Sequence, residues 1–209
     1  MLKGRITGEH LARELTAFAF TVACAWFFQW QAKDLIWGLW TSSLCVGYSF
    51  IVFSIVSGAL RARRQIPVLL ILAGALFLLA FFSVHFCMFH YGHSVFLNLF
   101  FPLMPESGRG FPNLFVTLET ALKAYWPVVL ATYLSRWHDF LPDGQSLDGM
   151  KNGNTLTKPY ANVVRMHILI FVFAGLAAVH ATHLAVYPVL LFYFFPWRMI
   201  LKKSEASAE

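Results

Sequence analysis

The stretch IPVLLILAGALFLLAFFSVHFCMFH, residues 66–90, contains no Asp, Glu, Lys or Arg. A helix of about 20 apolar residues spans the hydrocarbon core of a bilayer, which is about 30 Å thick. Pro67 stands near the start of the stretch, where proline suits the first turn of a helix. The stretch therefore predicts a transmembrane helix over residues 66–90.

The rest of the 209-residue chain has the same character. Hydrophobic residues make up 58% of it and charged residues only 12%, against about 25% charged in a soluble domain. Further apolar stretches that predict spans lie at about 11–30, 35–60, 112–135, 161–182 and 184–201, the last being short and interrupted by prolines. Asp34 is placed to cap the start of the second span. We expect an all-α fold, a polytopic membrane helix bundle of about six transmembrane helices forming a single membrane domain, residues 1–209.

The start of the chain lacks a small-residue cleavage site after a short apolar core, so we expect it to be the first span and not a signal peptide.

The basic residues are distributed unevenly over the predicted loops. With a cytoplasmic N-terminus, 13 of the 16 fall on the inner side: Lys3, Arg5, Arg13, Arg61, Arg63, Arg64, Arg136, Lys151, Lys158, Arg165, Arg198, Lys202 and Lys203. Positive charge is enriched in cytoplasmic loops. The sequence thus predicts that both termini are inside, an N-in/C-in topology. The net charge of +6 then serves topology and lipid headgroups, so we expect the lipid bilayer and no nucleic acid as partner.

Two of the predicted loops are longer than the other connections, and tryptophans cluster around a third. Residues 94–111 are apolar and outer, which predicts an interfacial segment or lid. Residues 137–160 are rich in Gly, Asp and Asn and predict an inner loop. Four tryptophans flank the first outer hairpin as an aromatic belt would: Trp26, Trp30, Trp37 and Trp40.

Five of the eight histidines fall into two groups, VHFCMFHYGH at 84–93 and VHATH at 179–183. Counted from the inner ends of their predicted spans, His85 and His180 both lie about 29 Å along a helix. We therefore expect both groups at one depth, near the outer edge of the membrane. Residues three apart lie on the same face of a helix, so His180 and His183 are expected to share a face.

Imidazole binds transition metals, and this concentration of histidines predicts a periplasm-facing metal site. Its expected ligands are His85, His90, His93, His180 and His183. Glu119, inside the fourth span, is the candidate catalytic residue, as general base, or a further ligand; an i,i+4 ion pair with Lys123 is an equally favoured interpretation. Interhelical hydrogen bonding or a proton relay is the alternative for the histidines, and hydrogen bonding is the interpretation preferred for His167.

Zinc is the expected metal because a carboxylate accompanies the imidazoles, with copper or iron as further candidates. Met88 is able to approach the histidine face and would favour copper, whereas Cys87 points elsewhere. Haem b, held by His85 and His180, is a less favoured cofactor. The sequence contains no HEXXH, G-x-S-x-G or P-loop motif. We expect a metal-dependent membrane hydrolase or oxidoreductase acting on a lipid-like or small substrate, with metal transport or handling as the alternative.

The segment FSVHFCMFHYGHSVFLNLFF, residues 82–101, carries a His-Tyr-Gly motif in a Phe-rich context. It resembles a family of small bacterial inner-membrane proteins of unknown function. The resemblance implies a multi-pass protein of the bacterial inner (plasma) membrane and a functional role for His85, His90 and His93. It implies no particular activity.

Overall fold

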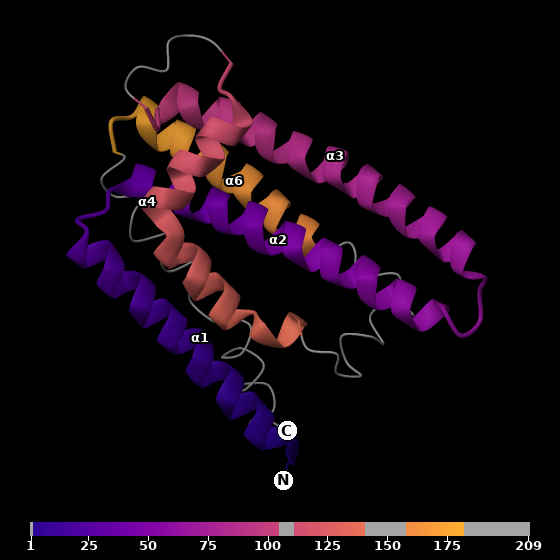
Figure 1. The fold of residues 1–209 in the computed structure, drawn as a ribbon. Coiled ribbons are helices and arrows are strands. Elements are labelled where there is room, and N and C mark those ends of the chain that lie inside the picture. The colour runs from indigo at the N-terminus through magenta and orange to yellow at the C-terminus, as the bar shows by residue number, and fades with distance from the viewer. Residues whose placement is uncertain (1, 105–110, 141–157, 182–209) are drawn as a thin grey trace.

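The structure, a computed structural model, describes residues 2–104, 111–140 and 158–181 (Figure 1). These residues form the helices α1 (Leu2–Phe27), α2 (Ala32–Ala62), α3 (Val68–Phe100), α4 (Leu114–Ser135), η1 (Trp137–Phe140) and α6 (Lys158–Ala178). No strand occurs among them, which confirms the all-α class. Within these ranges, α2, α3 and α4 are long and apolar enough to cross a bilayer, which suggests a membrane protein. The expected span at 184–201 lies outside the described residues.

Helix α3 differs from its expected bounds more than its neighbours do. It continues ten residues past His90, straight through Gly92, and ends at Phe100. Ser94 and Leu97 in this extension are buried, which gives the helix a reason to continue. The interfacial segment expected at 94–111 is therefore helical over its first seven residues, 94–100. The loop expected at 137–160 begins as η1 and ends as the first residues of α6.

Helix α2 is the centre of the bundle, since it packs against α3, α4 and α6, while α1 packs on α4 (Figure 1). The backbone N–H of Gln31 donates to Oδ2 of Asp34 at 2.7 Å, so Asp34 stabilises the start of this helix from its third position, while the N-cap that Asp34 was expected to provide is Gln31. The hydroxyl of Tyr125 donates to Oδ1 of the same carboxylate at 2.8 Å. The Asp34 carboxylate thus accepts one hydrogen bond at the start of α2 and one from α4, which links the two helices.

Two glycines let α2 approach its neighbours closely. A Cβ atom at Gly38 would lie 2.9 Å from a methyl carbon of Val128 on α4. A Cβ at Gly47 would lie 2.6 Å from the ring of Phe86 on α3. Small residues at helix contacts are a usual feature of membrane bundles, because helices there associate through close packing.

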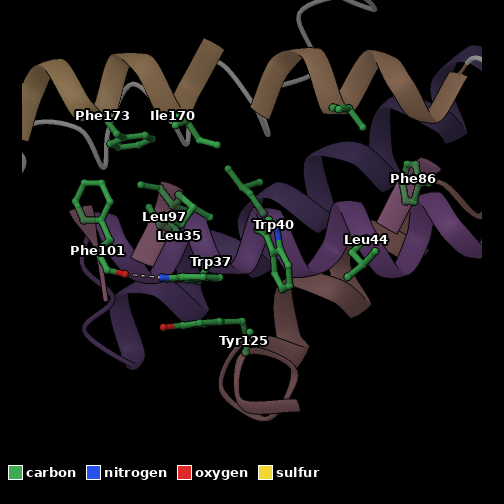
Figure 2. Close-up of a cluster of buried hydrophobic side chains, with 14 of the residues drawn as sticks. Leu35, Trp37, Trp40, Leu44, Phe86, Leu97, Phe101, Tyr125, Ile170 and Phe173 are labelled. Atoms are coloured by element: carbon green, nitrogen blue, oxygen red, sulfur yellow. Dashed lines mark hydrogen bonds between the residues drawn. The ribbon is translucent and has the colours of Figure 1, made fainter. Parts of the chain in front are cut away.

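Helices that follow one another in the chain alternate in direction, as Figure 1 shows. Consequently α3 and α6 run parallel. His93 contacts His167. Further toward the C-terminal ends of α3 and α6, Phe101 contacts Phe173 (Figure 2). Alternation is what a multi-pass topology requires. The six spans and the cytoplasmic termini stay predictions.

The expectation of an aromatic belt was wrong for two of its tryptophans. Trp37 and Trp40 are fully buried between helices and do not face an interface. The indole N–H of Trp37 donates to the carbonyl of Phe101 at 2.8 Å (Figure 2). The indole N–H of Trp40 donates to the carbonyl of His90 at 2.9 Å. A buried indole needs such an acceptor. These two bonds join α2 to the C-terminal part of α3.

Candidate metal site between helices α3 and α6

An open groove of about 300 Å³ runs along the contact between α3 and α6. The residues that line it are His85, Met88, Phe89, Gly92, His93, Phe96 and His167. Six of the seven come from α3 at spacings of one, three or four residues, so they form one stripe on that helix. The groove is apolar apart from its imidazoles.

Two of these imidazoles form a hydrogen-bonded pair between helices. Nε2 of His93 lies 2.6 Å from Nδ1 of His167, and the ring centroids are 4.3 Å apart. The His93 side chain is buried, whereas His167 is exposed. Nδ1 of His93 is buried and has no hydrogen-bond partner among the described residues. We assign the proton of His93 to Nε2, since this tautomer donates to His167 and leaves no buried N–H unpaired.

His90 lies next to this pair but is occupied by other partners. Its Nδ1 donates to the carbonyl of Phe86 at 3.0 Å, and its Nε2 accepts from the hydroxyl of Ser43 at 3.2 Å. The ring is fully buried and its centroid is 5.9 Å from that of His93. With both nitrogens engaged, His90 joins α3 to α2 as an interhelical hydrogen bonder.

His85 lies at the other end of the groove. Its ring stacks on Phe81, with centroids 5.4 Å apart, and is 5.6 Å from the ring of Tyr160 on α6. Eight residues separate His85 from His93, which places their Cα atoms about 12 Å apart on a regular helix. The two rings therefore share a groove but not a point within it.

His85 and His180 do not lie at one depth, and the expectation was wrong for this pair. His85 is level with Tyr160, near the start of α6. His180 follows the end of α6 at Ala178, about 27 Å further along the helix, and adopts a positive φ of 54°. The register between α3 and α6 is set by the aromatic packing around Tyr160, which counting from predicted loops does not reveal. His183 lies outside the described residues.

Glu119 lies away from the groove, on an exposed face of α4. Its carboxylate forms an ion pair with the ammonium of Lys123 at 2.6 Å, and both side chains are exposed. The structure thus contains the ion pair with Lys123 that was one of the two interpretations of Glu119. In the described ranges, no three His, Cys, Asp or Glu side chains converge in a way that would hold a metal ion.

His167 lines the groove although it was not among the expected metal ligands. It was expected to be a hydrogen bonder, and the hydrogen bond is present. Its partner is one of the expected metal ligands, His93, because α6 is shifted along α3 by several turns. Only the register of these two parallel helices would have brought them together, and hydropathy carries no information on that register.

Comparison with known proteins gives a family and no function. No curated protein and no solved structure matches the chain. A family model described as a family of unknown function, DUF6498, matches residues 10–197. The match agrees with the expected likeness to proteins of unknown function, while the His-Tyr-Gly motif and the bacterial origin stay predictions. The chain belongs to the DUF6498 family.

Proposed function

We propose that the protein is a multi-pass membrane protein that binds one transition-metal ion in the α3–α6 groove through His93 and His167. The observation that carries this proposal is the pair itself: imidazole nitrogens from two helices, 2.6 Å apart, beside an open groove. Imidazole is the commonest metal ligand in proteins. The proposal keeps His93 from the expected ligand set and adds His167.

The geometry requires little adjustment to accept an ion. Two nitrogens that bind one tetrahedral ion at about 2.0 Å each stand about 3.3 Å apart. The pair would open by less than about 1 Å to reach that separation. His93 is fixed by its burial in α3, whereas the exposed ring of His167 has room to rotate. The ion would replace the proton that the two rings now share.

The surroundings of the groove support a membrane setting. Large apolar side chains of α3 face outward, among them Leu69, Leu76 and Phe77, which are each more than 60% exposed. Lipid is the solvent that such a surface needs. The six apolar stretches and the asymmetry of basic residues support six spans with cytoplasmic termini. The resemblance of residues 82–101 supports a bacterial inner membrane. The groove would then lie toward the outer end of α3.

An ion held by two imidazoles retains open coordination positions, as catalytic metal sites do. The groove around it is lined by Met88, Phe89 and Phe96, so an apolar molecule would fit beside the ion. We therefore favour a metal-dependent enzyme acting on a lipid-like substrate. Metal transport is less favoured, because Glu119 and Lys123 pair on an exposed face of α4 and do not extend a path from His167. Haem is not favoured, because His85 and His180 lie far apart along the bundle.

Elemental analysis of the detergent-purified protein tests the proposal. We expect about one transition-metal ion per chain in the parent protein and none in the double variant His93→Ala/His167→Ala. His85→Ala is the matched control, since it removes an imidazole from the same groove about 12 Å away and should leave the metal content unchanged. A parent protein that binds no metal, or a double variant that retains it, would show the proposal to be wrong.

A further inference from the structure

We propose that a phospholipid binds between α1 and α4, with one acyl chain in a groove between these helices and its phosphate at Arg136 and Trp137. The groove has a volume of about 400 Å³. It shares no lining residue with the α3–α6 groove, so it is a second site. The inference rests on the membrane setting proposed above and does not depend on the metal ion.

The α1–α4 groove has an apolar floor and apolar edges. Ala17 of α1 and Ala131 of α4 line it and are buried, whereas Phe20, Leu130 and Leu134 line it and are exposed. Small buried residues between large exposed ones make a furrow that opens to the surroundings of the bundle. An acyl chain has the apolar surface that such a furrow favours.

A free hydrogen-bond donor stands at one end of the furrow. Because α1 and α4 run in opposite directions, Thr16 and Trp137 mark the same end (Figure 1). Trp137 is 56% exposed, and no residue in the described part of the chain accepts a hydrogen bond from its indole N–H. The hydroxyl of Thr16 already donates to the carbonyl of Ala12 at 2.7 Å. We therefore expect the ligand to bring an acceptor oxygen to the Trp137 end.

The short helix η1 holds Trp137 at this end. Phe140, in the same turn, packs its ring against Phe50 and Phe53 of α2, with centroids 5.9 and 5.8 Å away. This contact anchors η1 on α2, so the first residue of η1, Trp137, is fixed beside the last turn of α4. An indole placed in this way suits the level of the lipid headgroups, where tryptophan is enriched in membrane proteins.

Arg136 adds a positive charge next to the indole. Its Nε donates to Oδ2 of Asp139 at 3.2 Å, which leaves the two Nη groups of the guanidinium for a ligand. A guanidinium presents its donors in a fork that matches the oxygens of a phosphate. Basic pockets between helices at the cytoplasmic side of a membrane bind lipid headgroups in this way. In the topology proposed above, the end of α4 lies on that side.

The length of the furrow suits an acyl chain better than a partner helix. From Leu130 to Trp137 it extends about 10 Å along α4. The hydrocarbon core is about 30 Å thick, so one leaflet contributes about 15 Å. A partner helix would contact the bundle over much of the full thickness, whereas an acyl chain lies within one leaflet.

The test is native mass spectrometry of the full-length protein in detergent, titrated with dioleoylphosphatidylglycerol or dioleoylglycerol. The second lipid has the same acyl chains and no phosphate. The double variant Arg136→Gln/Trp137→Phe removes the donors. Leu130→Trp narrows the furrow without touching η1, and Leu122→Trp is its matched control, because Leu122 lies on α4, is similarly exposed and does not line the furrow.

We expect one tightly bound phosphatidylglycerol per chain and at least about tenfold weaker binding of dioleoylglycerol, since hydrogen bonds from a charged group contribute at least that factor. The double variant should weaken phosphatidylglycerol binding at least about tenfold. Leu130→Trp should weaken the binding of both lipids, and Leu122→Trp should match the parent.

Equal affinities for the two lipids, or parent-like binding by either the double variant or Leu130→Trp, would overturn the lipid site. A dimer of the chain that Leu130→Trp abolishes would show that a second copy occupies the furrow instead. The metal content of the His93–His167 site is measured separately, so failure of the lipid site and failure of the metal site are distinguishable.

Discussion

Helices α2 and α3 are both long and apolar, yet the bundle uses them differently. Helix α2 is buried over most of its length and carries small residues at its contacts, including Gly38, Ser43 and Gly47. Helix α3 exposes large Leu and Phe side chains over its first half, and only residues from Phe86 onward are fully buried. Hydropathy alone does not separate the two helices.

The difference follows from the solvent. Where lipid surrounds a bundle, an exposed leucine costs nothing, and helices associate through close packing and hydrogen bonds. The hydroxyl groups of α2 are satisfied locally, as when Thr41 donates to the carbonyl of Trp37 at 2.7 Å. Small and hydroxyl side chains therefore mark the helix that belongs in the centre. Three substitutions test this contrast, from the largest expected effect to the smallest.

Phe86→Ala should be the most damaging, because the Phe86 ring is fully buried against Gly47 of α2 and contacts His90 and Tyr160. We expect a loss of about 2–4 kcal/mol from the cavity it leaves. Phe77→Ala, on the exposed part of the same helix, should change stability by less than about 0.5 kcal/mol. Unfolding by SDS in mixed micelles measures both. Equal losses would mean that the two halves of α3 have the same environment.

Gly47→Ala places a methyl group where a contact of 2.6 Å with the Phe86 ring would result. Overpacking of this kind costs about 1–3 kcal/mol. Gly74→Ala on α3 meets nothing within 4 Å and should stabilise the helix by about 0.5–1 kcal/mol. In the same unfolding assay, Gly47→Ala should thus lower the free energy of unfolding and Gly74→Ala should raise it. A change of the same sign in both variants would refute the contrast between the helices.

Ser43→Ala should have the smallest effect of the three. It removes the hydroxyl that donates to Nε2 of His90 and leaves that buried nitrogen without its partner. We expect a loss of about 1 kcal/mol. Thr16→Ala is the control, because its hydroxyl bonds within α1 at an exposed position, and less than about 0.5 kcal/mol should be lost there. If the two variants are equally stable, His90 does not hold α3 to α2.

The sequence was sufficient for the helices and insufficient for their register. Long apolar runs predicted α2 and α4 to within a few residues. Asp34 was correctly placed at the start of α2, although the N-cap residue is Gln31. The end of α3 was missed, because the span was taken to end with the apolar stretch at His90. In the structure the helix continues, since its last turns pack against Trp37 and Trp40.

The candidate site was predicted only in part, because the register between the helices was not predicted. His93 was among the expected ligands, but its partner was not, because pairing His93 with His167 depends on how far α6 is shifted along α3. That shift is fixed by aromatic contacts such as Phe89 with Tyr160 and Phe101 with Phe173. Contacts of this kind have no periodic signal within either helix.

The central claim is that one metal ion lies between His93 and His167, and X-ray absorption spectroscopy of the metal-loaded protein tests it most directly. The account predicts two imidazole nitrogens at about 2.0 Å, identified by the multiple scattering of their rings. His167→Ala should remove one of them. A spectrum with oxygen ligands only, or one that His167→Ala leaves unchanged, would contradict the claim.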